Sequence, residues 1–337
     1  MTDLQVHRSR QGSQVDIIIP CKAIDSYVEK CLAHCNSLNY ENFQIILLPD
    51  QKIERSLPKT EIISTGSVYP SEKRNIGIKN SFGEFCAFVD SDAYPHEQWL
   101  ANALTIFADE KVGCVGGPNL IPPDSLLYEQ VGTDILYSRL GVGAFPKKKY
   151  KKGLYEVREL SSSNLIVRRE LLEAIGGFDI TLLTAEDAKL CFQINEKDYK
   201  VIFAEEVVVY HHRRPIFLPF LESIAIYGRD KAFLLKEFFS FHKLHYFLPS
   251  LFLVGLVFGL VLSIKSHLIL QVYMAVMFIY FLLILLQSLI FPGVKRKLLI
   301  FCGIPLTHIF YGVGFIKGLM GSRERVKNSW LAKKSQV

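Results

Sequence analysis

Short apolar runs alternate with amphipathic segments over the first two hundred residues. The runs at 14–20, 43–48 and 84–89 are rich in β-branched, leucine or aromatic residues and end at proline or aspartate, as buried strands do. Segment 25–38 instead repeats apolar residues at helical spacing. The same patterns predict strands at 112–116, 161–167 and 201–210, and helices at 73–81, 99–107, 170–175 and 185–195. Strands that alternate with helices predict an α/β domain with a mostly parallel sheet covered on both faces.

A different pattern begins near residue 216. Segment 216–245 mixes aromatic and basic residues at helical spacing, which predicts amphipathic helices in a membrane interface. Three long apolar stretches follow at 246–264, 268–291 and 298–320. The first two contain no charged side chain and are long enough to cross a hydrocarbon layer of about 30 Å. Buried helices of a soluble protein are the alternative, but such a uniformly apolar helix lacks the polar face that they need. We therefore expect a globular domain at 1–215, interfacial helices at 216–245, a membrane domain at 246–320 and a basic tail at 321–337.

Charge and cysteine content refine this picture. The net charge is +6, with basic clusters at 147–152 and in the last third of the chain. Beside membrane helices such clusters favour anionic lipid headgroups over nucleic acid as partner. The first fourteen residues contain no apolar run of a secretory signal, and the seven cysteines show no paired spacing. These features predict that the globular domain lies on the cytoplasmic face with reduced thiols.

The third apolar stretch leaves the topology open. If the first two stretches cross and return, the basic residues 295–297 lie in the cytosol, in agreement with the positive-inside rule. A third crossing would place Lys317 and the basic tail outside, against that rule. Pro305 and several glycines also weaken a simple span, so we favour a re-entrant or interfacial helix over a spanning one. Gly314 and Gly318 are alternatively a helix-packing face.

Two carboxylates follow the predicted strand at 84–89. Asp90 and Asp92 are separated by one residue, so on an extended backbone both face the same side. Carboxylate oxygens are the ligands that Mg²⁺ and Mn²⁺ prefer, and these ions leave positions open for phosphate. A turn with helix-capping aspartates is the alternative. The position after a buried strand favours the metal site, because ligands of such sheets gather at the carboxyl ends of strands.

Other charged residues flank the same predicted edge. Lys73 and Arg74 open a predicted helix, where basic side chains suit a diphosphate or form an ordinary solvated helix end. Asp50 follows the strand at 43–48 and either accepts hydrogen bonds from a nucleoside or caps a turn. Glu186 and Asp187 open another helix just after GGFD; the helix dipole favours acids there, but a carboxylate held beside a pocket also suits a general base.

The order of these motifs resembles a known family. PCKAIDSYVEKCL, FQIILLPD, SEKRNIGIKNSFGEFCAFVDSD, SSSNLIVRRELLEAIGGFD and AEDAKL are similar, in that order, to the family 2 glycosyltransferases with a GT-A fold. The resemblance covers about residues 14–215. It implies a Rossmann-like mixed, mostly parallel sheet and an inverting transfer of a hexose or deoxyhexose from a nucleoside-diphosphate sugar, with Mg²⁺ or Mn²⁺ as cofactor.

The resemblance also assigns roles to residues. It implies that Asp92 and Asp90 bind the metal, that Asp90 also binds the diphosphate, and that Asp187 is the catalytic base beside Glu186. The substrate-binding residues that it implies are Pro20, Asp50, Lys73, Arg74, His211, His212, Arg213 and Arg214. The chain departs from the common pattern at Pro49, where many members have a second acid, and it lacks the Gln-x-x-Arg-Trp motif of processive synthases.

Membrane anchoring beside such a site predicts a lipid-linked, polyprenyl-type glycan or a cell-surface glycan as acceptor. The alternatives are transfer of one sugar to the polyprenyl phosphate itself and a membrane-tethered nucleotide-binding scaffold without turnover. A sugar-nucleotide nucleotidyltransferase is disfavoured, because PCKAIDS lacks the glycine-rich phosphate loop that such enzymes place after the first strand. The sequence leaves the sugar, the base and homo-oligomerisation open.

Overall fold

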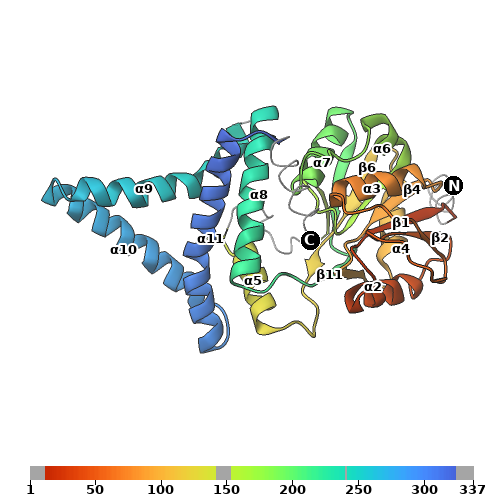
Figure 1. The fold of residues 1–337 in the computed structure, drawn as a ribbon, viewed down its shortest axis with the longest axis horizontal. Helices are drawn as coiled ribbons and strands as arrows, with labels where there is room; N and C mark the ends of the chain where they lie inside the picture. Colours follow the sequence, from red (N-terminus) through yellow and green to blue (C-terminus); the bar gives the residue numbers. More distant parts are fainter. Residues whose placement is uncertain (1–11, 142–152, 240, 324–337) are drawn as a thin grey trace. The chain divides into compact units, whose positions relative to one another are not determined.

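The computed structural model describes residues 12–141, 153–239 and 241–323 (Figure 1). The chain divides into two compact units. Unit 1 comprises Met1–Pro122, Tyr150–His212 and Lys327–Val337, and unit 2 comprises Pro123–Lys149 and Arg213–Val326. Residues 123–149, which we expected within the globular segment, thus group with unit 2. The lysine-rich segment 147–152 and most of the basic tail at 321–337 lie outside the described residues.

Unit 1 is built on an eight-stranded sheet of order β3-β2-β1-β4-β9-β6-β10-β8. Its strands are β1 (Val15–Pro20), β2 (Phe43–Leu48), β3 (Thr60–Ile62), β4 (Phe85–Phe88), β6 (Val112–Gly116), β8 (Leu154–Glu156), β9 (Leu165–Arg168) and β10 (Lys200–Ala204). β1 pairs in parallel with β2 and β4, β2 with β3, and β10 with β6; β9 runs antiparallel between β4 and β6, and β8 is antiparallel to β10. The predicted mixed, mostly parallel sheet is confirmed.

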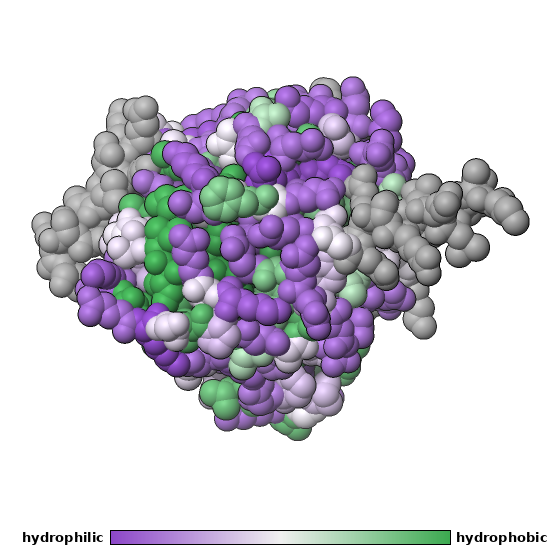
Figure 2. Space-filling model, turned by 90° about the vertical axis from the view of Figure 1, so that its right-hand side faces the viewer, coloured by the Kyte–Doolittle hydropathy of each residue, from purple (hydrophilic) through white to green (hydrophobic). Residues whose placement is uncertain are grey.

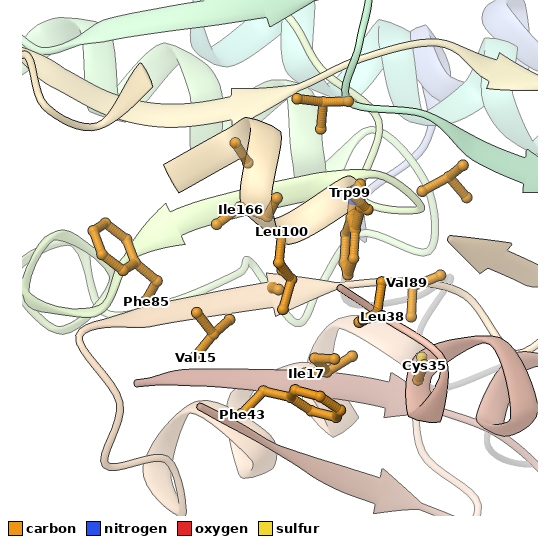
Figure 3. Close-up of a cluster of buried hydrophobic side chains, with 14 of the residues drawn as sticks. Val15, Ile17, Cys35, Leu38, Phe43, Phe85, Val89, Trp99, Leu100 and Ile166 are labelled. Atoms are coloured by element: carbon orange, nitrogen blue, oxygen red, sulfur yellow. The ribbon is translucent and has the colours of Figure 1, made fainter. Parts of the chain in front are cut away.

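Helices cover both faces of this sheet. Every residue of β1 is buried, and its side chains alternate between two apolar clusters: Ile17 belongs to one and Ile18 to the other. The first cluster, drawn in Figure 3, packs against α2 (Ser26–Asn36) and α4 (Trp99–Ile106). The second packs against α3 (Pro70–Lys79), α6 (Arg169–Ile175) and α7 (Glu186–Glu196). Burial on both faces explains why these strands read as continuous apolar runs.

One predicted element was wrong in a way that matters for function. The run at 201–210 is not a single strand, because the chain turns at Glu205 and Glu206 after β10. A separate strand, β11 (Val209–His211), then joins a three-stranded sheet between β5 (Ala93–Pro95) and β7 (Asn119–Leu120). The two acids at 205–206 favour an exposed turn over a buried strand. This break brings the end of β11 to the start of β5.

Unit 2 is helical. It contains α5 (Leu127–Tyr137), α8 (Leu218–Glu237), a 3₁₀ turn (Phe241–Phe247), α9 (Leu248–Ser263), α10 (His267–Leu289) and α11 (Val294–Met320). In the described residues, three helical segments are long and apolar enough to cross a membrane: Leu244–Ser263, His267–Leu289 and Val294–Met320. The third apolar stretch is one uninterrupted helix with Pro305 inside it, so no re-entrant break is present within Val294–Met320.

The surfaces of the two units differ accordingly. The face shown in Figure 2 is mostly hydrophilic, with hydrophobic side chains gathered on one side of the view. Most exposed large apolar side chains of the described chain instead lie between residues 248 and 320. Such a band of exposed apolar residues is expected where lipid, rather than water, is the solvent.

Candidate active site

The functional side chains gather at the carboxyl-terminal edge of the parallel strands. β1 and β2 are in register with Pro20 opposite Leu48, and β1 and β4 with Ile18 opposite Phe88. Pro20, Asp50 and Asp90 therefore leave the sheet at one edge, as the sequence predicted. What holds them there is α3, whose residues 73, 74 and 75 each contact a different part of this edge.

Lys73 fixes the end of β2. Its side chain is 5% exposed, and Nζ donates to Asp50 Oδ1 at 2.5 Å, to the Cys21 carbonyl at 2.5 Å and to the Leu48 carbonyl at 3.1 Å. One ammonium group thus joins the ends of β1 and β2 and sets the position of the Asp50 carboxylate. The predicted contact of Lys73 with a diphosphate stays a prediction.

Arg74 joins the two acidic centres. Its side chain is 3% exposed; Nη2 donates to Asp90 Oδ1 at 2.6 Å and Nη1 donates to Glu186 Oε1 at 2.8 Å. Burial lowers the pKa of this guanidinium, but the carboxylates of Asp90 and Glu186 raise it above its ordinary value overall. The guanidinium therefore stays charged. Its planar group holds Asp90 at one nitrogen and Glu186 at the other.

Asn75 positions the loop before the second acidic pair. Its Nδ2 donates to the Phe178 carbonyl at 2.8 Å, and its Oδ1 accepts from the Phe178 backbone N–H at 2.8 Å. Gly177, at φ 78°, lies against the same amide, and a Cβ there would come within 2.4 Å of Asn75 Oδ1. GGFD therefore needs glycine both for its backbone angle and for this close approach.

Asp90, Asp92 and His211 form a cluster suited to a divalent cation. One ligand atom from each of the three lies within 4.8 Å of the others. His211 Nε2 is 3.1 Å from Asp92 Oδ1, while His211 Nδ1 is buried without a hydrogen-bond partner among the described residues. Two carboxylates and an imidazole fit Mn²⁺ well, because Mg²⁺ takes oxygen ligands almost exclusively. The sequence assigned His211 to the diphosphate and did not predict its position beside Asp90 and Asp92.

An aromatic layer sets the direction of His211. β11 pairs antiparallel with β5, with Tyr210 opposite Tyr94, and these rings stack 5.2 Å apart. Alternate side chains of a strand point to opposite faces, so Tyr210 and His212 share the face away from His211. His212 lies 4.9 Å from the Tyr27 ring of α2. The two histidines thus have different surroundings, and a role of His212 at the diphosphate stays a prediction.

Asp187 is held at the start of α7. Its Oδ2 accepts the Ser162 backbone N–H at 3.0 Å, and its Oδ1 accepts the Ala188 N–H at 2.7 Å. The residue before the acidic pair, Ala185, has φ 62°, a left-handed conformation that costs of order 1–3 kcal/mol for a residue other than glycine. This turn leaves Glu186 buried toward Arg74 and Asp187 half-buried. The sequence missed Ser162, although SSSN marks it as a polar turn before a strand.

The buried acid of this pair has a shifted pKa. Burial, with the adjacent Asp187 carboxylate, raises the pKa of Glu186 to about 8, although Arg74 opposes the shift. An unfolded glutamate titrates near 4.3. The folded state therefore binds more protons than the unfolded state between these values, and stability falls as the pH rises through this window.

We expect the apparent Tm to fall between pH 5 and pH 8 more steeply in the wild type than in Glu186→Gln, because glutamine mimics the protonated acid. Each kcal/mol corresponds to roughly 2–4 °C. Scanning fluorimetry in nanodiscs at several pH values measures the difference, with the exposed Glu61→Gln as control. Parallel Tm–pH curves for Glu186→Gln and the wild type would show that Glu186 is ionised throughout.

Arg213 and Arg214 follow β11 directly but belong to unit 2, and their predicted role at the diphosphate stays a prediction. In unit 1, α3 contacts the three functional centres through consecutive residues: Lys73 reaches Asp50, Arg74 reaches Asp90 and Glu186, and Asn75 reaches the GGFD loop. Asp90 and the Glu186–Asp187 pair are thus two hydrogen bonds apart across Arg74.

Comparisons with known proteins identify relatives of this chain. Residues 16–176 match the model of the family described as Glycosyl transferase family 2. Over 335 residues the chain is 23% identical to a dolichyl N-acetyl-alpha-D-glucosaminyl phosphate 3-beta-D-2,3-diacetamido-2,3-dideoxy-beta-D-glucuronosyltransferase of Methanococcus voltae, covering 93% of this chain and 99% of that protein. It is 24% identical over 219 residues to Glycosyltransferase AglE of Haloferax volcanii, covering 60% and 67%.

A solved structure shows the same fold. Mannosyltransferase PcManGT from Pyrobaculum calidifontis, in complex with GDP-Man and Mn²⁺, aligns with a TM-score of 0.56 at 15% identity, covering 91% of this chain and 87% of that one. The protein is therefore a glycosyltransferase of family 2, with a GT-A domain followed by long apolar helices.

Proposed function

We propose that the protein is an inverting glycosyltransferase that moves a sugar from a nucleoside diphosphate to a lipid-linked glycan at a membrane surface. The observation that carries this proposal is the arrangement around Arg74: a metal-type cluster on one side and the Glu186–Asp187 pair on the other. A donor diphosphate and an acceptor hydroxyl need such neighbouring sites. The Methanococcus relative, which matches over nearly its whole length, has dolichyl N-acetyl-alpha-D-glucosaminyl phosphate in its name.

The chain's own residues have separate tasks in this reaction. Asp50, fixed by Lys73, and Pro20 would contact the nucleoside. Asp90, Asp92 and His211 would hold Mn²⁺ or Mg²⁺, which when bound supplies positive charge for the departing diphosphate. Asp187, oriented by the Ser162 N–H, accepts the proton of the acceptor hydroxyl.

The bond changes balance in a single displacement. The acceptor oxygen forms a bond to the anomeric carbon as the bond from that carbon to the diphosphate oxygen breaks, and the nucleoside diphosphate leaves with the electron pair. The proton ends on the Asp187 carboxylate. Because attack and departure lie on opposite faces of the sugar, the anomeric configuration inverts. The buried Arg74 keeps Asp90 and Glu186 at a fixed separation, which preorganises the site for this step.

The acceptor class is tested with purified protein in nanodiscs. We expect divalent-ion-dependent transfer from a nucleoside-diphosphate sugar to a polyprenyl-linked glycan, and much weaker transfer to the same glycan without its lipid. Thin-layer analysis of the lipid products separates chain extension from transfer of one sugar to polyprenyl phosphate. Equal rates with and without the lipid would contradict the lipid-linked acceptor while leaving the glycosyltransferase assignment in place.

A further inference from the structure

The three long apolar helices of unit 2 are not equivalent. In the apolar windows of α9 with its preceding turn and of α10, 17% and 6% of residues are buried, against 44% for α11. α9 and α10 contain no charged residue, whereas α11 begins with Lys295, Arg296 and Lys297 and carries Lys317 near its end. Other parts of unit 2 therefore cover nearly half of α11, but little of α9 and α10.

The cover is α8, which lies along the second half of α11. Glycines allow the backbones to approach closely: a Cβ on Gly314 would lie 1.9 Å from the Ala225 carbonyl oxygen, and one on Gly318 would lie 2.3 Å from that of Arg229. A Cβ on Gly228 would lie 2.5 Å from the Tyr311 oxygen. This confirms the helix-packing face predicted for Gly314 and Gly318. Figure 1 shows the two helices side by side.

α8 is too polar to accompany a span through hydrocarbon. In its twenty residues it carries Glu222, Arg229, Asp230, Lys231, Lys236 and Glu237. A charged side chain at the centre of a bilayer costs at least about 2.5–3.5 kcal/mol. Polar contacts also fix the ends of α11: Arg296 pairs with Asp134 of α5 at 2.6 Å, and Lys236 donates to the Gly318 carbonyl at 2.9 Å.

The hairpin of α9 and α10 has both of its ends on α11. α9 begins against Gly312, where a Cβ would lie 2.8 Å from the Pro249 oxygen, and α10 ends at Leu289, just before Val294. These two points are 18 residues apart on α11, which is about 27 Å along a helix. The ends of a hairpin that crosses and returns lie on one side of the bilayer. A helix that joins both ends therefore runs along the membrane rather than through it.

We infer that α8 and α11 lie together in one bilayer interface and that only α9 and α10 cross the membrane. The partner of this surface is the boundary between acyl chains and anionic headgroups. Val294, Leu298 and Met320 expose 75%, 60% and 85% of their surface for the acyl side. Lys295, Lys297 and Lys317 supply charge complementary to acidic headgroups at both ends of α11. Ser322, which follows α11, then lies on the same side of the bilayer as the residues that precede α8 in the chain, and Lys265, in the turn after α9, lies on the opposite side.

Cysteine accessibility tests this topology in the full chain. The background carries Cys302→Ser, because Cys302 is the exposed cysteine among seven and the other six are buried. Single variants Ser37→Cys, Lys265→Cys and Ser322→Cys are exposed to an impermeant maleimide in sealed vesicles of both orientations. We expect positions 37 and 322 to react from one side and position 265 from the other. Reaction of 322 together with 265, or of all three from one side, would overturn the inference.

Depth measurements provide a second test. A fluorophore on Cys302, or on Val313→Cys in the Cys302→Ser background, is quenched by lipids brominated at different depths. We expect both positions to report the same shallow depth. If α11 spans, the two labels lie about 16 Å apart along the bilayer normal, since they are eleven residues apart. Neither test depends on sugar transfer, so failure here is distinguishable from failure of the proposed function.

Discussion

Replacing Asp187 with asparagine is expected to lower kcat by roughly 10²–10⁴-fold, the usual contribution of a general base. Asparagine keeps the shape of the side chain and still accepts the Ser162 N–H, but it cannot take the acceptor proton. In the proposed mechanism the donor binds through the acids and the histidine on the other side of Arg74, so donor binding should change little. Initial rates at saturating acceptor, with nucleoside-diphosphate binding measured in parallel, separate the two effects.

Glu196→Gln is the matched control for this variant, since it removes an exposed carboxylate from the far end of the same helix. It should keep wild-type activity. Full activity of Asp187→Asn would remove the base from the mechanism, and unchanged glycan production in cells would favour the non-catalytic scaffold. Loss of nucleotide binding in Asp187→Asn would instead show that this carboxylate belongs to the donor site.

Replacing Arg74 with methionine is expected to destabilise the protein by about 3–5 kcal/mol at pH 9, above the pKa of about 8 of Glu186, because it leaves the ionised Glu186 carboxylate buried without its cation. The apparent Tm should fall by roughly 6–20 °C. Activity should also fall where the variant is still folded, since Asp90 loses the group that fixes its orientation.

The double variant Arg74→Met/Glu186→Gln distinguishes a buried charge from lost packing. If the unpaired Glu186 carboxylate causes the destabilisation, the double variant should recover a large part of the lost Tm. No recovery would assign the loss to packing around residue 74. A Tm within about 2 °C of the wild type for Arg74→Met alone would show that the ion pairs of Arg74 with Asp90 and Glu186 do not stabilise the fold.

The sequence predicted the edge of the site better than its interior. β1, β2 and β4 were evident because strands buried on both faces are continuous apolar runs, and Asp50 and Asp90 were found because they follow those runs. The partners of Arg74 could not be predicted, since Glu186 is 112 residues away and only the fold brings the two together. Helix periodicity predicts which residues of α3 are buried, but it does not predict which residue Arg74 contacts.

His211 illustrates a different limit. Its role depends on the turn at 205–206, which separates β11 from β10 and pairs it with β5. Apolar periodicity continues through that turn, so the sequence predicted one strand and placed His211 with the basic residues that follow it. The helix at Leu127–Tyr137 was also missed, because the glycine and charged residues of its sequence mask its apolar face.

We propose that Asp90, Asp92 and His211 hold one divalent cation beside the acidic pair at 186–187. Pulsed EPR of the wild-type protein with Mn²⁺ and a nucleoside diphosphate tests it most directly. We expect one bound Mn²⁺ per chain with an imidazole nitrogen coupling that disappears in His211→Ala, and much weaker binding in Asp92→Asn. A bound Mn²⁺ whose spectrum and affinity are unchanged in both variants would contradict it.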